Sequence, residues 1–89
     1  MKLVTIRITG YVQGVGFRWL ARKAAYRYGI KGFVKNNDDG SVTIEAEGTN
    51  EQIESFVAWC KSSNTAGRVD HLEILEGKMK FHSTFEIIS

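Results

Sequence analysis

The feature that most constrains this chain is a change of hydrophobic period across a short glycine-containing stretch, residues 10–18. Before it, Val4, Ile6 and Ile8 alternate with other residues, the two-residue period of a strand with at least one buried face. After it, apolar residues recur at the spacing of a helix. They are Phe17, Leu20, Ala21, Ala24 and Tyr28. The glycines are therefore predicted to lie in a turn that joins a strand to a helix.

This turn has the chemical groups needed to bind an anion. Gly10, Gly14 and Gly16 permit positive φ angles and leave room for a ligand, so that several backbone N–H groups can point into one concavity. The first turn of the helix adds unpaired donors and the positive end of its dipole. Arg18 adds a planar, permanently charged guanidinium suited to phosphate oxygens. The residues alone leave a second interpretation open, in which the glycines only form a turn.

The size and composition of the chain indicate a single domain over residues 1–89. Hydrophobic residues make up 43% and charged residues 25%, as in soluble globular proteins. No apolar run is long enough to span a membrane and no signal-peptide core is present, so we expect a cytoplasmic protein. The one cysteine, Cys60, cannot form an internal disulfide. The net charge of +2 is too small to indicate a nucleic-acid partner, although it suits a small anion.

The rest of the chain alternates between strand and helix patterns. The first helix is expected from Phe17 to Tyr28, ending at Gly29. A second helix follows a capping box formed by Thr49 and Gln52, and its apolar stripe places Cys60 on the buried side. The remaining segments are strands at 30–36, 42–47, 69–75 and 81–88, the last with Phe85 and Ile87 on one face, and a loop at 62–67.

The order of these elements is βαββαβ with one more strand, which predicts a ferredoxin-like α+β sandwich. In that fold a mainly antiparallel sheet carries both helices on one face, and its first and third strands are central. Here a fifth, C-terminal strand is added. The glycine turn would follow a central strand, while Phe33 to Asn36 would lie on another strand of the same sheet. A side chain near the end of that segment can therefore face the turn.

The common catalytic constellations are not supported by the sequence. Asp70, His71 and His82 are the only suggestive metal ligands, but strand alternation places the first two on opposite faces. No Ser-His-Asp or Cys-His arrangement, dinucleotide fingerprint or nucleotide P-loop is present. We therefore expect neither a metal nor a cofactor. What remains is the glycine turn, Arg18 and the asparagines at 36 and 37.

These residues suit the hydrolysis of an activated phosphate compound. Phosphoryl transfer depends mainly on positioning and on charge stabilisation. In a mixed anhydride of a carboxylic and a phosphoric acid, the leaving carboxylate has a conjugate-acid pKa of about 4, so it departs without a general acid. Backbone donors and one arginine would hold the phosphoryl group, and one uncharged amide could orient the attacking water.

Two segments of the chain resemble the signatures of the acylphosphatase family. The first is Ile8-x-Gly10-x-Val12-Gln13-Gly14-Val15-x-Phe17-Arg18, and the second is Gly32-Phe33-Val34-Lys35-Asn36-x-x-x-Gly40-x-Val42, followed by Gly48. With the order of strands and helices, the resemblance covers essentially the whole chain. It implies a ferredoxin-like fold and metal-free hydrolysis of acyl phosphates to carboxylate and inorganic phosphate.

The resemblance also assigns roles to residues. Arg18 corresponds to the catalytic, phosphate-binding arginine and Asn36 to the asparagine that orients the nucleophilic water. The backbone N–H groups of the anion cradle, residues 13–18, would bind the substrate; these residues are Gln13, Gly14, Val15, Gly16, Phe17 and Arg18. Two departures lie outside the signatures: a Gly-Pro pair common in the loop after the second helix is missing, and the chain ends in Ile88-Ser89 instead of an aromatic residue.

Two other functions compete with hydrolysis. The first is a catalytically silent module of the same fold that binds a small anion, against which the intact Arg18 and Asn36 argue. The second is RNA recognition, because residues 31–34 resemble a signature strand of RNA-recognition modules, but that signature needs further aromatics and belongs on the third strand. We expect a monomer whose partners are an acyl phosphate substrate and inorganic phosphate as product and inhibitor, with no nucleic acid or membrane.

Overall fold

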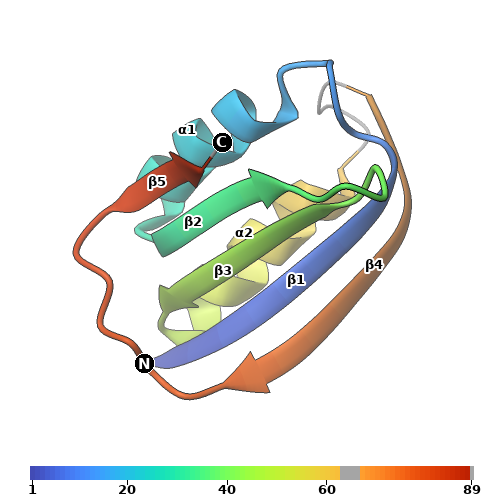
Figure 1. Ribbon diagram of the computed structural model, residues 1–89. Coiled ribbons are helices and arrows are strands. Elements are labelled where there is room, and N and C mark those ends of the chain that lie inside the picture. The colour runs from blue at the N-terminus through green and yellow to red at the C-terminus, as the bar shows by residue number, and fades with distance from the viewer. Residues whose placement is uncertain (63–66, 89) are drawn as a thin grey trace.

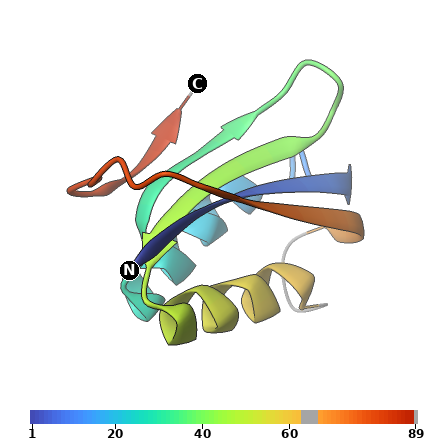
Figure 2. The same ribbon diagram turned by 90° about the horizontal axis from the view of Figure 1, so that it is seen from below.

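A computed structural model describes residues 1–62 and 67–88 and shows one five-stranded sheet with two helices on the same face (Figures 1 and 2). The elements are β1 (Lys2–Tyr11), α1 (Phe17–Tyr28), β2 (Lys31–Asn36), β3 (Val42–Gly48), α2 (Asn50–Lys61), β4 (Arg68–Gly77) and β5 (Phe85–Ile88). The ferredoxin-like α+β prediction is confirmed. No helix in the described part of the chain is long and apolar enough to cross a membrane.

The sheet has the strand order β4-β1-β3-β2-β5, so β1 and β3 are central, as predicted (Figure 1). All neighbouring strands are antiparallel except β2 and β5, which run parallel. One row of apolar residues crosses the whole sheet in register. From one edge to the other it contains Ile74, Ile6, Ile44, Val34 and Ile87. This row aligns the strands, because a slip of one residue would turn a strand's buried side chains to the opposite face.

The core lies between the sheet and the two helices (Figure 2). Its largest fully buried side chains are Phe17 of α1, Phe56 of α2 and Phe85 of β5. The rings of Phe56 and Phe85 meet edge to face with centroids 6.2 Å apart. Cys60 is buried in the same core, as predicted, and burial raises the pKa of its thiol to about 12. The thiol is therefore protonated and unreactive at neutral pH.

A capping interaction fixes the C-terminal end of α1, and another fixes the start of α2. Gly29 follows α1 in the left-handed region, with φ of 73°, and its N–H donates to the carbonyl oxygen of Ala25. The Thr49 hydroxyl accepts from the backbone N–H of Gln52, and the Gln52 side chain accepts from the N–H of Thr49 in return. The predicted end of α1 and the predicted capping box of α2 are thus confirmed. Most of the predicted loop at 62–67 lies outside the described residues.

The prediction for the last strand was wrong at its start. A strand was expected from Phe81, but β5 begins only at Phe85, and Phe81 is exposed with a positive φ of 59°. The reason is Glu47, a buried residue of β3 whose carboxylate accepts from the backbone N–H groups of Lys80, Phe81 and His82 at 2.6, 3.0 and 2.6 Å. These three donors bind a side chain instead of a neighbouring strand, so the segment turns around the carboxylate.

We predict that Glu47→Gln lowers the free energy of unfolding at pH 7 by about 1–3 kcal/mol, because a charged acceptor of three N–H groups is lost. Burial by itself would raise the pKa of Glu47, but the three donors outweigh it and hold the pKa below its ordinary value of 4.5. The stabilisation is therefore complete above about pH 4.5 and is lost as the pH falls through the lower folded-state value.

Urea unfolding of both proteins at pH 7 and pH 3 measures this effect. The stability difference between wild type and Glu47→Gln should narrow at pH 3. Glu76→Gln is the matched control, because Glu76 is exposed and its carboxylate lies 3.5 Å from the Lys2 ammonium in a surface ion pair. An equally small change for both variants at pH 7 would contradict the role given to Glu47.

Candidate active site

A pocket of about 190 Å³ lies where the loop after β1, the start of α1 and the end of β2 meet. Its walls combine glycine backbone, one guanidinium, one amide and several apolar side chains. The lining residues are Val12, Gly14, Gly16, Phe17, Arg18, Trp19, Asn36 and Ile87. The two sequence signatures therefore meet at one site, although β3 separates β1 from β2 in the sheet.

The backbone of the anion cradle is open to a ligand. Gly14 and Gly16 have φ angles of 75° and 80°, and a Cβ atom built at either position meets nothing within 4 Å. Gly16 is the N-cap of α1, and no side-chain hydrogen bond caps this helix end. The N–H groups of the first helical turn have no acceptor within the helix, and they carry the positive end of its dipole. An anion can therefore approach the backbone closely here.

Arg18 is a half-buried residue of the first turn of α1 and lines the pocket. Its Nη1 donates to the backbone carbonyl oxygen of Ile88, 3.3 Å away at the end of β5. The contact is made by the main chain, so it does not depend on an aromatic side chain at the end of the protein. A guanidinium has five N–H donors in a planar fork, which leaves others for a ligand.

Asn36 is the last residue of β2 and also lines the pocket. Its side-chain Oδ1 is buried and has no hydrogen-bond partner in the described part of the chain. Burying an acceptor without a partner costs about 1–3 kcal/mol, and such atoms are rare in native structures. The oxygen therefore makes no hydrogen bond that stabilises the described structure, and it belongs to a residue that lines the same pocket as Arg18.

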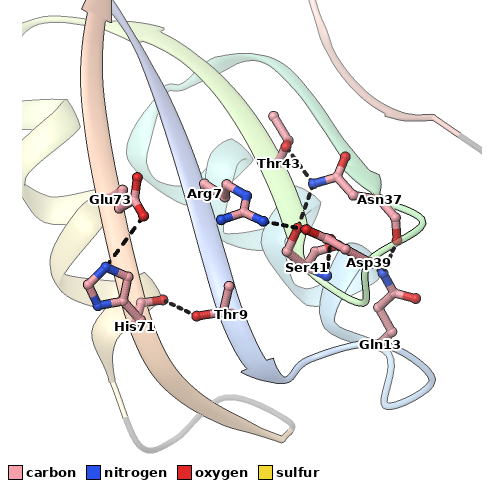
Figure 3. A network of polar contacts seen from close by, with 9 residues as sticks. All are labelled: Arg7, Thr9, Gln13, Asn37, Asp39, Ser41, Thr43, His71 and Glu73. Atoms are coloured by element: carbon pink, nitrogen blue, oxygen red, sulfur yellow. Dashed lines mark hydrogen bonds and ion pairs between the residues drawn. The ribbon is translucent and has the colours of Figure 1, made fainter.

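The next residue, Asn37, uses its side-chain nitrogen as a donor in the turn between β2 and β3 (Figure 3). Its Nδ2 donates to the Ser41 hydroxyl at 2.9 Å and to the Thr43 hydroxyl at 2.8 Å. Asn37 is not among the residues that line the pocket. Its side chain serves the hairpin, in line with the turn propensity seen in the sequence.

The side chain of Gln13 points from the cradle loop toward the same hairpin (Figure 3). Its Nε2 donates to the backbone carbonyl oxygens of Asn37 and Ser41, each at 2.8 Å. The sequence analysis assigned only the backbone of Gln13 to the cradle. It missed this bridge because the acceptors lie 24 and 28 residues further along the chain. The bridge fixes the cradle loop relative to the end of β2.

A second tie joins the hairpin to β1. Asp39 accepts hydrogen bonds from the Ser41 hydroxyl at 2.5 Å and the Ser41 N–H at 2.9 Å, and it forms an ion pair with Arg7 of β1 (Figure 3). These partners, Ser41 above all, lower the pKa of Asp39 from 3.8 to about 2. Its carboxylate therefore stays charged, and the tie to β1 intact, at neutral and moderately acidic pH.

Two other residues expected in the cradle have side chains packed in or against the core. The Phe17 side chain is 1% exposed and belongs to the core, and Val15 is half-buried against it. Gln13 and Val15 flank the pocket and do not line it. Trp19 lies outside the apolar stripe predicted for α1 and was given no role from the sequence, yet it forms part of the pocket wall.

The suggestive metal ligands do not come together. Within residues 1–62 and 67–88, no three His, Cys, Asp or Glu side chains form a group that could hold a metal ion. Asp70, His71 and His82 pair with separate partners, which are Arg68, Glu73 and Glu45.

The comparison with protein families identifies the chain. The model described as acylphosphatase matches residues 4–87. The chain belongs to the acylphosphatase family. An acylphosphatase of Lactobacillus gasseri is 51% identical over 75 residues, which are 83% of this chain and 82% of that protein. The relative from Lactiplantibacillus plantarum is 44% identical over 88 residues, 98% of each chain.

The fold comparison agrees with the family assignment. The crystal structure of acylphosphatase from Bacillus subtilis has a TM-score of 0.94 with this chain, at 36% identity and with full coverage of both chains. This member of the acylphosphatase family lacks the Gly-Pro pair that is common in the loop after α2. Most of that loop lies on residues that the structure does not describe. It also has Ile88-Ser89 where many family members end in an aromatic residue, but the main-chain carbonyl oxygen of Ile88 still accepts from Arg18.

We predict that Gln13→Glu destabilises this acylphosphatase fold, because a carboxylate oxygen would face two carbonyl oxygens that now accept from an amide. The expected loss is about 1–3 kcal/mol in the free energy of unfolding, with a weaker inhibition by phosphate if the cradle shifts. Urea unfolding and inhibition assays measure both quantities.

The matched control is Gln52→Glu in the capping box of α2. There the side-chain oxygen accepts from the Thr49 N–H, and a glutamate keeps that acceptor. Gln52→Glu should therefore change stability much less than Gln13→Glu. Equal losses in the free energy of unfolding for the two variants would show that the Gln13 hydrogen bonds do not stabilise the fold in the way proposed.

Proposed function

We propose that this chain hydrolyses acyl phosphates at the pocket that contains Arg18 and Asn36. In this proposal the Arg18 guanidinium and the backbone N–H groups of residues 13–18 hold the phosphoryl oxygens. The Asn36 amide orients the attacking water. The observation that carries the proposal is that Asn36 and Arg18 line one pocket, with the buried Oδ1 of Asn36 left without a partner among the described residues.

The reaction balances without a further reactant. Water attacks phosphorus, the bond from phosphorus to the bridging oxygen breaks, and the carboxylate leaves with the electron pair. One proton of the water goes to a phosphate oxygen, so that an acyl phosphate dianion gives a carboxylate and dihydrogen phosphate. Because the leaving group is the anion of an acid with a pKa of about 4, no protein group needs to protonate it.

The cradle and Arg18 stabilise the negative charge of the phosphoryl group through hydrogen bonds. The open backbone at Gly14 and Gly16 lets N–H groups approach the phosphate oxygens, and the guanidinium adds bidentate hydrogen bonds. The contact from Arg18 to the Ile88 carbonyl holds the guanidinium beside the pocket before substrate arrives. Such preorganisation avoids the cost of ordering the side chain during the reaction.

Asn36 supplies a neutral acceptor for the nucleophile. An amide oxygen can accept one hydrogen bond from water without repelling the dianionic substrate, as a carboxylate in its place would. Its position at the end of β2, fixed by pairing with Val42 of β3, gives the water one direction of attack.

We further propose that the protein acts as a cytoplasmic monomer without nucleic-acid or membrane partners. The single thiol, Cys60, is buried and cannot form an internal disulfide, which suits a reducing compartment. Acyl phosphate and inorganic phosphate are then the ligands of the site.

We expect the purified protein to hydrolyse benzoyl phosphate at the same rate with and without a metal chelator, because the proposed mechanism uses only protein groups. Inorganic phosphate should inhibit competitively, since it fits the same cradle. Release of benzoate, followed by absorbance, measures both effects. Phosphate binding without turnover would favour the catalytically silent module instead.

The same assay on the variant Arg18→Lys tests the role of Arg18 in holding the phosphoryl group. One ammonium cannot reproduce the bidentate geometry of a guanidinium, so most activity and phosphate affinity should be lost while the protein stays folded. Near-normal turnover of Arg18→Lys would show that the cradle is assigned wrongly.

For Asn36→Ala we predict a fall in kcat of about a hundredfold, with little change in phosphate inhibition, because the interaction with water matters chiefly in the transition state. The thermal midpoint should not fall, since the Oδ1 atom that is removed makes no hydrogen bond in the described structure.

Asn37→Ala is the neighbouring control with the opposite pattern. It removes two hydrogen bonds to hairpin hydroxyls, so it should lower stability while the folded protein keeps its kcat. If the two variants lose activity equally and in proportion to folded protein, Asn36 has no catalytic role.

A further inference from the structure

An exposed tryptophan forms part of the pocket wall. Trp19 directly follows Arg18 in the first turn of α1, lines the same pocket as Asn36, and has 59% of its surface exposed. An indole ring has a large apolar area and only one hydrogen-bond donor, so it adds little to the binding of a phosphoryl group. Its place beside the anion cradle therefore calls for another explanation.

Packing does not supply that explanation. The other tryptophan, Trp59 of α2, is partly buried against the core, with its ring 5.9 Å from Phe17 and 6.1 Å from Phe56. Trp19 is not part of the core cluster and has no aromatic partner in the described residues. Trp59 thus stabilises the fold, while Trp19 leaves most of its ring in solvent.

The position of the Trp19 ring is nevertheless fixed from one side. Lys23 lies one helical turn further along α1, and its ammonium nitrogen is 5.3 Å from the centre of the indole. Trp19 also lines a neighbouring hollow together with Arg22, Lys23 and Tyr26. The indole therefore forms the ridge between this hollow and the pocket with Arg18.

We propose that Trp19 binds the acyl group of the substrate and favours acyl phosphates whose acyl group is aromatic. The inference rests on the proposed function, which places the phosphoryl group in the cradle. The acyl end must then extend from the cradle toward the rest of the pocket wall. Of the two aromatic residues that line the pocket, the Phe17 side chain is buried in the core, so Trp19 offers the exposed ring.

The chemistry of the wall selects the substrate class. Besides the indole, the pocket wall has the partly exposed apolar side chain of Ile87, and an aromatic acyl group would cover this surface from water. Stacking or edge contacts between aromatic rings add to that effect. An acetyl group is too small to reach the same contacts. Trp19 would thus determine specificity, while Arg18 and Asn36 act on every acyl phosphate alike.

The test compares kcat/KM for benzoyl phosphate and acetyl phosphate in the wild type, Trp19→Ala, Trp19→Phe and Tyr26→Ala. We expect Trp19→Ala to lower the ratio of benzoyl to acetyl phosphate about tenfold, the size of a lost aromatic contact. Trp19→Phe should restore most of the ratio. Tyr26→Ala removes an exposed aromatic residue of the same helix that lines only the neighbouring hollow, so it should leave the ratio unchanged.

The outcomes separate this inference from the proposed function. A wild type that hydrolyses both substrates, with a ratio that Trp19→Ala does not change, would overturn the inference and leave the function standing. An equal fall of the ratio in Tyr26→Ala would also overturn it, because the effect would then belong to the helix surface. A wild type that hydrolyses neither substrate would overturn both.

Discussion

The Gln13 side chain connects the two halves of the candidate active site. The cradle loop follows β1 and Asn36 ends β2, but these strands are not neighbours, because β3 lies between them. Gln13 spans that gap with hydrogen bonds of 2.8 Å to two carbonyl oxygens of the hairpin, and the pair of Arg7 and Asp39 supports the same hairpin from β1. Without such ties, the cradle and Asn36 would be related only through the sheet, and their separation would vary with its twist.

Two adjacent asparagines show how position decides the role of identical side chains. Asn36 ends its strand at the pocket and has a buried side-chain oxygen without a partner in the described structure, whereas Asn37 donates to two hydroxyls of the turn. Folding alone would favour a partner for both, since an orphaned acceptor lowers stability. The unsatisfied group is thus a cost to the fold, and in the function proposed above the attacking water would supply the missing partner.

Local sequence patterns were sufficient to predict the helices and strands and to point to several residues of the candidate site. Hydrophobic period placed β1, α1 and the turn between them, although β1 continues through Gly10 to Tyr11 and the turn starts later than predicted. The two signatures pointed to Arg18 and Asn36, which the fold brings to one pocket. What the sequence could not predict depends on contacts between distant residues. The strand expected from Phe81 is shortened by a carboxylate on β3, and the direction of the Gln13 and Trp19 side chains follows from how loop, helix and hairpin pack together.

The position of β1 also affects how the protein comes to fold. Its two neighbours, β3 and β4, both follow it in the chain, so Leu3 pairs with Glu47 on one side and with Gly77 on the other. A nascent chain emerging from the ribosome cannot complete this central strand until nearly all of it has been synthesised. Such pairings between distant residues make folding slow compared with helical proteins of equal length. The anion cradle, which follows β1 in the chain, therefore gains its final shape only after β4 has been synthesised.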